Sequence, residues 1–241
     1  MSTDIGANLE AVRKRMVTAA KRADRDPSEI KLVAVSKTQS VASIRQAIGA
    51  GATVIGENKV QEAESKIREV GRDAGEWHLI GHLQSNKARK AVQLFDVIES
   101  VDSLELAKRL ERICEEEGRE ELSVFVQVDL AGEETKSGVS ESELPDLNAF
   151  LKTCKHLRAN GLMILPPYFD DAEKTRPYFR RLRKLRNDLQ GQNVFANGFG
   201  ELSMGMSHDF EVAIEEGATV VRVGTAIFGA RNLAADKTRM K

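Results

Sequence analysis

The chain contains 241 residues, of which 41% are hydrophobic, with 36 Lys plus Arg against 37 Asp plus Glu. This composition is typical of a globular protein and excludes the disordered and fibrous classes. The formal net charge of −1 supplies no positive field for a phosphate polymer, so no nucleic acid partner is expected.

Membrane insertion and disulfide formation are not expected either. No run approaches the roughly 18 to 20 apolar residues of a membrane span. The opening MSTDIGANLEAVRKRM has charges where a secretion signal has its apolar core. Cys114 and Cys154 lie far apart, without a CxxC motif or a nearby histidine pair, so neither a disulfide nor a metal site is indicated. These features predict a cytoplasmic protein.

Eight short runs rich in valine, isoleucine and leucine alternate with longer segments of helical period. This alternation is typical of βα units around a parallel sheet. The strands are expected at 30–36, 53–55, 77–80, 97–101, 123–129, 157–163, 200–203 and 219–223.

The segments between the strands are expected to form outer helices, and an extra helix over 8–23 precedes the first strand. The segment 104–113 has apolar residues at helical spacing among charged ones. The segment 176–189 carries many basic residues opposite an apolar stripe. This pattern favours a solvated charged face over a docking surface for an acidic partner.

Capping residues mark several helix ends. Ser103 and Ser140 are expected to be N-caps of the helices that follow them. Gly51 and Gly217 are expected to take left-handed conformations where helices end.

An internal repeat strengthens this organisation. AIGAGATVI at 47–55 and AIEEGATVV at 213–221 share a helix end, a glycine turn and a β-branched strand. Eight βα units in a chain of this length favour a single closed (β/α)8 barrel spanning 1–241. An open doubly wound sheet is the alternative, although no GxGxxG follows the first strand.

In such barrels the active site lies at the carboxyl ends of the strands. Lys37 directly follows the first strand, so its amine is expected to enter the barrel mouth. Partial desolvation there lowers a lysine pKa and leaves neutral amine to attack an aldehyde. Alternatively, Lys37 ends a strand and extends into solvent.

The last two βα connections resemble a phosphate site. They read LSMGMSHD at 202–209 and VRVGTAIFG at 221–229. Gly205 and Gly224 permit close backbone approach, and Ser203, Ser207 and Thr225 supply hydroxyl donors. Ordinary turn chemistry is the alternative interpretation. A lysine amine facing a phosphate site indicates pyridoxal 5′-phosphate held as a Schiff base.

Arg222 alternates inward near the end of the last strand. An arginine at the pyridine nitrogen of the cofactor keeps that nitrogen unprotonated and weakens the ring as an electron sink. The expected consequence is mild carbanion chemistry or none.

Five motifs together resemble a known family. LVAVSKTQ, GENKVQEA, WHLIGHLQSNK, LSMGMSHDFEVAI and VRVGTAIFGAR are similar, in order and spacing, to those of the pyridoxal-phosphate homeostasis proteins, also called the proline synthetase co-transcribed family. The resemblance covers about residues 5 to 232. It implies a fold-type III barrel, similar to the N-terminal domain of alanine racemase.

The resemblance also implies roles for individual residues. Lys37 would carry the cofactor covalently, Arg222 would face the pyridine nitrogen, and Asn58 would lie near the ring hydroxyl. The phosphate would be held by Ser207, Gly224 and Thr225, together with Ser203. The family is implicated in vitamin B6 homeostasis and in amino-acid and keto-acid balance without established catalysis, so no catalytic residue is assigned.

Two classes of function remain open at this stage. One is a monomeric carrier that hands the cofactor to apo-enzymes. The other is a racemase-like enzyme that uses Lys37 and Tyr168 as bases. A weaker third option is a Schiff-base aldolase or phosphosugar isomerase without cofactor.

The roles of several further residues stay undecided. His78 and His82 are either acid-base groups or structural histidines. Lys136 lies in a charged loop and falls where racemases hold an arginine, and Gln39 stands where the family often has lysine.

Overall fold

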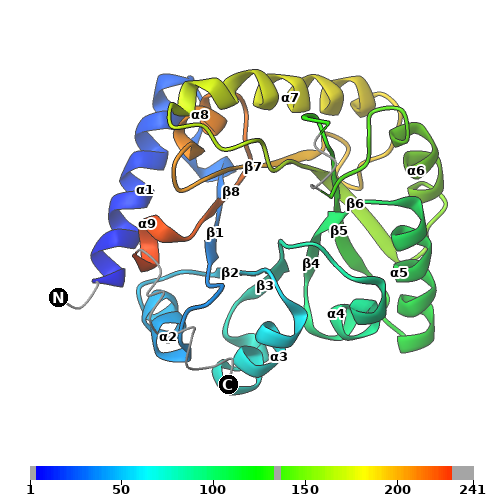
Figure 1. The fold of residues 1–241 in the computed structure, drawn as a ribbon, viewed down its shortest axis with the longest axis horizontal. Helices are drawn as coiled ribbons and strands as arrows, with labels where there is room; N and C mark the ends of the chain where they lie inside the picture. The colour runs from blue at the N-terminus through cyan, green and yellow to red at the C-terminus, as the bar shows by residue number, and fades with distance from the viewer. Residues whose placement is uncertain (1–3, 133–136, 230–241) are drawn as a thin grey trace.

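The computed structural model describes residues 4–132 and 137–229. Over these residues, eight parallel strands form a closed barrel in sequence order, with the helices around it (Figure 1). The predicted (β/α)8 barrel is therefore confirmed, and the open doubly wound sheet is excluded. Within the described ranges, no helix is both long and apolar enough to cross a membrane.

The helices and strands follow the predicted alternation. The strands are β1 Lys31–Val35, β2 Val54–Glu57, β3 Glu76–Leu79, β4 Val97–Val101, β5 Leu122–Gln127, β6 Leu157–Met163, β7 Glu201–Met206 and β8 Val220–Val223. The α-helices are α1 Ile5–Arg22, α2 Val41–Gly49, α3 Val60–Val70, α4 Ala88–Leu94, α5 Leu104–Glu117, α6 Leu144–Leu151, α7 Arg176–Gln190, α8 Phe210–Glu215 and α9 Thr225–Phe228. Short 3-10 helices lie at Pro27–Glu29, Arg72–Ala74, Ser85–Lys87 and Ala172–Thr175.

The largest difference from the predicted strands lies in β7, which continues to Met206 instead of ending at Ser203. The first half of the segment predicted as a phosphate loop is therefore strand. Pairing with β8 resumes at Met206 beyond an irregularity. Gly205 permits this irregularity because its φ is +94°, a conformation that residues with side chains rarely adopt.

Side chains along the strands alternate between the barrel interior and the layer under the helices. The interior holds a small apolar cluster, formed by Val33, Val35, Val54, Ile80, Val97, Phe125, Met163 and Val220. The larger cluster joins the outer strand faces to the helices, and it includes the fully buried Trp77. The interior apolar cluster is small because polar residues take other inward positions, and these residues shape the site.

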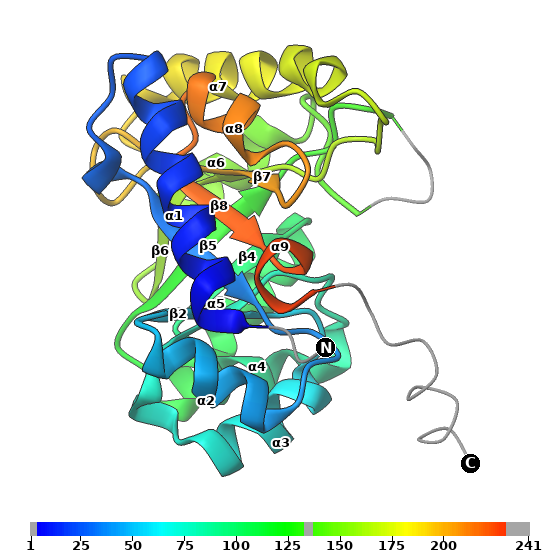
Figure 2. The same ribbon diagram turned by 90° about the vertical axis from the view of Figure 1, so that its left-hand side faces the viewer.

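The N-terminal helix α1 covers the seam where the barrel closes. There β1 pairs with β8, from Lys31 opposite Val220 onward. Figure 2 shows α1 running beside α8 and α9 across this seam. Asn8 Nδ2 of α1 donates to the carbonyl of Ile227 in α9 at 2.9 Å. The predicted extra helix is therefore confirmed, and it starts earlier because Asp4 accepts a hydrogen bond from the Ala7 amide.

The predicted caps have mixed outcomes. Ser103 does cap α5, since its hydroxyl accepts from the Leu106 amide. The prediction that Ser140 caps the next helix is wrong. Its hydroxyl donates to Glu143, and α6 begins only at Leu144, because Pro145 favours the first helical turn.

The other local predictions are confirmed. Gly51 and Gly217 have φ values of +90° and +101° after α2 and α8. The predicted helix over 176–189 is present as α7, and it buries Phe179 and Leu182 while its basic residues face outward or pair with Glu216.

Candidate functional site

Lys37 lies directly after β1 at the end of the barrel where all strands finish. Ser36 before it is fully buried, and Lys37 itself is half-buried. Thr38 has a φ of +64°, which is an outlier for a β-branched residue. Such strain persists only where neighbouring groups hold the backbone in place.

The groups that hold this turn come from the next βα unit. The buried Lys66 ammonium donates to the Ser36 carbonyl at 2.6 Å and lies 2.6 Å from a Glu57 carboxylate oxygen. The Glu62 carboxylate accepts from the Thr38 amide at 2.6 Å and from Lys66 at 2.7 Å. Burial raises the pKa of Glu57, against the lowering effect of Lys66. The backbone on both sides of the Lys37 position is thus fixed by charged hydrogen bonds.

An anion-binding geometry lies on the neighbouring strands. The Ser207 hydroxyl accepts from the amides of Gly224 at 3.1 Å and Ala226 at 3.3 Å. A hydroxyl also has one proton to donate. The exposed Thr225 begins α9 at this point. The Ser207 and Thr225 hydroxyls are donors of the kind that a phosphate group accepts from, whereas the two amides are already engaged by Ser207.

We call the group formed by Ser207, Thr225 and the amides of Gly224 and Ala226 the cradle. It lies close to the turn that carries Lys37. A Cβ built on Gly224 would lie 3.2 Å from the Val35 carbonyl oxygen, and Lys37 follows Val35 by two residues. The structure therefore brings Lys37, Ser207, Gly224 and Thr225 to one side of the barrel mouth.

Arg222 lies inside the barrel, and only 2% of it is exposed. Its guanidinium donates to the Ser203 hydroxyl and, at 2.7 Å, to the Ile164 carbonyl. Ser203 in turn donates to the fully buried Glu99 carboxylate at 2.5 Å. The hydroxyl of Ser203 is therefore engaged with Glu99 and Arg222, apart from the cradle of Ser207. Glu99 was not among the site residues predicted from the sequence. The one feature that could have indicated it is its position as a charged residue inside an apolar strand.

Asn58 follows β2 and borders a cavity of about 640 Å³ with Gly81 and His82. His82 is more than half exposed, and its Nδ1 lies 2.8 Å from Asp102 Oδ2 and 3.0 Å from the Ser137 hydroxyl. His78, for which the sequence left an acid-base and a structural role open, is buried and contacts two carboxylates.

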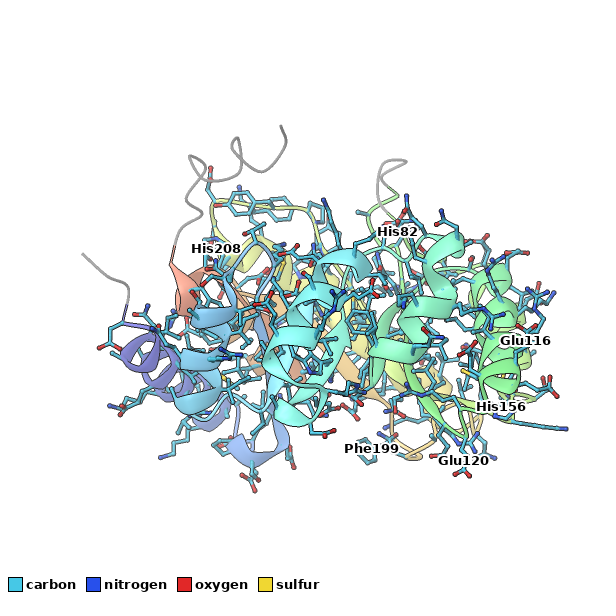
Figure 3. All side chains as sticks on the ribbon, turned by 90° about the horizontal axis from the view of Figure 1, so that it is seen from below. His82, Glu116, Glu120, His156, Phe199 and His208 are labelled. Carbon is cyan, nitrogen blue, oxygen red and sulfur yellow. The ribbon has the colours of Figure 1, made fainter. Side chains whose placement is uncertain are left out.

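The structure also locates other candidates from the sequence. Tyr168 is 73% exposed, and its ring lies 5.5 Å from that of His208. Figure 3 shows His82 and His208 at one end of the barrel and Phe199 at the other. Gln39 borders a second cavity near Thr38. Lys136 lies outside the described residues.

Comparisons with known proteins agree on one family. The profile for "Alanine racemase, N-terminal domain" matches residues 7–232. The pyridoxal phosphate homeostasis protein of Pseudomonas aeruginosa is 43% identical over 235 residues, covering 98% of this chain and 99% of that protein. The protein of the same name from Aquifex aeolicus is 41% identical, covering 92% and 96%.

Solved structures extend this similarity to three dimensions. PipY of Synechococcus elongatus, solved with PLP bound, is 40% identical, with a TM-score of 0.81, covering 93% of this chain and all of that one. Alanine racemase of Corynebacterium glutamicum is 20% identical, with a TM-score of 0.65, and covers 94% of this chain and 62% of the racemase. The racemase supports the fold alone.

Proposed function

Because this chain belongs to the pyridoxal phosphate homeostasis protein family, we propose that it binds pyridoxal 5′-phosphate at the barrel mouth as a Schiff base on Lys37. We propose further that it takes part in keeping the intracellular cofactor available, in the cytoplasm and as a monomer, by handing it to apo-enzymes that need it. The observation that carries the proposal is the Ser207 hydroxyl, hydrogen-bonded by two amides beside the turn of Lys37.

The residues present fit the cofactor. The Ser207 and Thr225 hydroxyls offer donors for its phosphate, Gly224 lets that group approach the backbone closely, and Lys37 offers an amine just after the adjacent strand β1. Asn58 on β2 is assigned to the ring hydroxyl. The cofactor, when bound, supplies an aldehyde for an amine and a ring that withdraws electrons.

The chain's own residues restrain that chemistry. A charged guanidinium at the pyridine nitrogen opposes protonation of that nitrogen, and Arg222 is the buried arginine assigned there. Ser203 acts through Arg222, since its hydroxyl bridges the guanidinium and Glu99. Glu62 and Lys66 hold the backbone of the turn and so fix the point from which the Lys37 side chain starts. These features suit a protein that holds the cofactor without promoting carbanion chemistry.

The test is the visible spectrum of the purified protein with added pyridoxal 5′-phosphate, before and after borohydride, with mass analysis of the trapped peptide. We expect the cofactor mass on the Lys37 peptide. Lys37→Ala should lose the covalent link while keeping part of the affinity, and Arg222→Glu should change the spectrum by protonating the ring nitrogen. Lys59→Ala, an exposed lysine nearby, is the matched control. Trapping on another lysine, or no binding at all, would overturn the proposal.

The racemase-like alternative requires a second acid-base group besides Lys37. Tyr168, the sequence candidate, is largely exposed and contacts His208. Incubating the loaded protein with each L-amino acid, followed by chiral analysis, decides between the two. Turnover that disappears in Lys37→Ala would replace the carrier by an enzyme.

A further inference from the structure

A row of charged side chains runs through the barrel interior from Arg222 to the opposite end. Glu99 Oε2 lies 3.9 Å from the Arg222 guanidinium, with Ser203 bridging them. Glu99 Oε1 lies 2.6 Å from His78 Nδ1. His78 Nε2 lies 3.0 Å from Glu76 Oε1. The signs of these groups alternate along the row when the imidazole is protonated.

The row ends at the amino-terminal side of the barrel. There Lys31 Nζ lies 3.2 Å from Glu76 Oε1. All of these residues occupy inward positions of β1, β3, β4 and β8, where such barrels usually carry valine, isoleucine or leucine. Arg222, His78 and Glu99 are each at most 2% exposed.

Stability does not explain this arrangement. Taking charges out of water is costly, and a buried ion pair is often no more stabilising than apolar residues of the same volume. Buried, strongly coupled titratable groups are instead typical of functional sites. The member of the row nearest the mouth is Arg222, whose guanidinium donates to the Ile164 carbonyl just after β6, so the function to consider is that of its guanidinium.

We infer that Glu99 and His78 are positioning residues that fix both the place and the charge environment of Arg222. This inference rests on the proposed function, which assigns Arg222 to the pyridine nitrogen. Glu99 holds the guanidinium through Ser203, and the protonated imidazole of His78 neutralises Glu99 from behind. The positive charge of Arg222 then acts undiminished at the mouth.

The charge of His78 controls this balance. The groups that face it are Glu76 on its own strand, Glu99 on β4, Glu201 on β7, Lys31 on β1 and, beyond Glu99, Arg222 on β8. Burial opposes the charged imidazole, but hydrogen bonds to Glu76 and Glu99 outweigh it and raise the pKa of His78 to about 8. When the imidazole loses its proton, it no longer balances the negative charge of Glu99. The Arg222 guanidinium is then the one positive group in the row that interacts with Glu99.

The first experiment uses the cofactor-free protein. The ring proton resonances of the histidines are followed by NMR as a function of pH, and His78→Gln assigns the His78 signal. Glu99→Gln should lower the titration midpoint of His78 by about one pH unit or more, because Glu76 is then the one carboxylate left in direct contact with the imidazole. Glu105→Gln, an exposed residue after β4, should leave it unchanged. An unmoved midpoint in Glu99→Gln overturns the inference.

The second experiment follows the absorbance of bound pyridoxal 5′-phosphate against pH. We expect a spectral transition with the midpoint of His78 in the unmodified protein, and no such transition in His78→Gln. Ser203→Ala, which removes only the bridge, should weaken the transition even if His78→Gln does not fold. Identical pH profiles in the unmodified protein and the variants overturn the inference and leave the proposed function standing. If the unmodified protein does not bind the cofactor, the proposed function fails. The NMR titration then still tests whether Glu99 sets the pKa of His78.

Discussion

Single hydroxyls and imidazoles have separate tasks at this site, although they occur in similar sequence surroundings. Ser203 and Ser207 lie four residues apart in one motif. Ser207 accepts two backbone amides at the mouth, whereas Ser203 is fully buried between Glu99 and Arg222. We therefore expect removal of the hydroxyl to have different consequences at the two serines.

Ser207→Ala should weaken binding of pyridoxal 5′-phosphate by about tenfold to a hundredfold. The physical reason is the loss of one hydrogen bond to a charged phosphate, which contributes about 1.5 to 3 kcal/mol. Titration of the protein with the cofactor, followed by fluorescence or dialysis, measures the change. Ser142→Ala, at an exposed serine, is the control, and equal affinities of the two variants would remove Ser207 from the phosphate site.

His78 makes the stability of the protein depend on pH. Its pKa in the folded chain is about 8, raised from 6.5 by its carboxylate partners against the effect of burial. A raised pKa means that the folded state binds the proton more tightly, so the stabilisation is complete below about pH 6.5 and is lost as the pH rises through 8. The difference corresponds to about 2 kcal/mol.

We therefore expect the free energy of unfolding to fall by about 2 kcal/mol between pH 6 and pH 9, beyond any change seen in His78→Gln. Urea denaturation at several pH values measures this difference. Parallel pH dependences in the two proteins would show that the imidazole is not held as an ion between Glu76 and Glu99.

At the scale of helices and strands, capping depends on more than the presence of serine before a helical segment. Ser103 has an extended backbone, and its hydroxyl accepts from an amide of α5. Ser140 precedes a turn, and Glu143 takes the position next to α6 instead. Comparing substitutions at the two serines therefore measures how much an N-cap hydrogen bond contributes to the free energy of unfolding.

Ser103→Ala should lower the free energy of unfolding by about 1 kcal/mol, because an amide of α5 loses its partner. Ser140→Ala should cost less than half of that, since no helical amide depends on its hydroxyl. Thermal and urea denaturation of both variants make the comparison. Equal losses would contradict the assignment of the cap to Ser103.

At the scale of the whole molecule, the closed barrel leaves little apolar surface for pairing. Among the described residues, the large hydrophobic side chains that are exposed are Val17, Tyr168 and Phe199. Figure 3 shows Phe199 at the end of the barrel opposite His208, which is the ring neighbour of Tyr168. These residues do not join into the kind of patch that marks an obligate interface.

The protein is accordingly expected to be a monomer of 26.6 kDa. Light scattering coupled to size-exclusion chromatography tests this over a range of protein concentrations, with and without pyridoxal 5′-phosphate. A mass of about twice that value at all concentrations would contradict the expectation and would direct attention to the outer helices.

The helices and strands and their order could be predicted from the amino-acid sequence. Alternating apolar runs and helical segments are local patterns. They were therefore enough to predict the eight strands, the leading helix and the position of Lys37 after β1. The proximity of Ser207 and Gly224 could be expected from the sequence, because they belong to consecutive βα connections whose ends meet in a barrel, while their role at a phosphate stays a prediction. The length of β7 could not be predicted, since Met206 joins the strand only through its partner in β8.

The contacts between interior side chains, in contrast, could not be predicted before the barrel was built. Glu99 and Ser203 are 104 residues apart, and Lys66 reaches the turn of Lys37 from another βα unit. The direction of a side chain follows from alternation within its own strand, but its neighbour depends on the stagger between strands and on barrel closure. No local pattern encodes that stagger. The partners of Arg222 could therefore be found only once the barrel was closed.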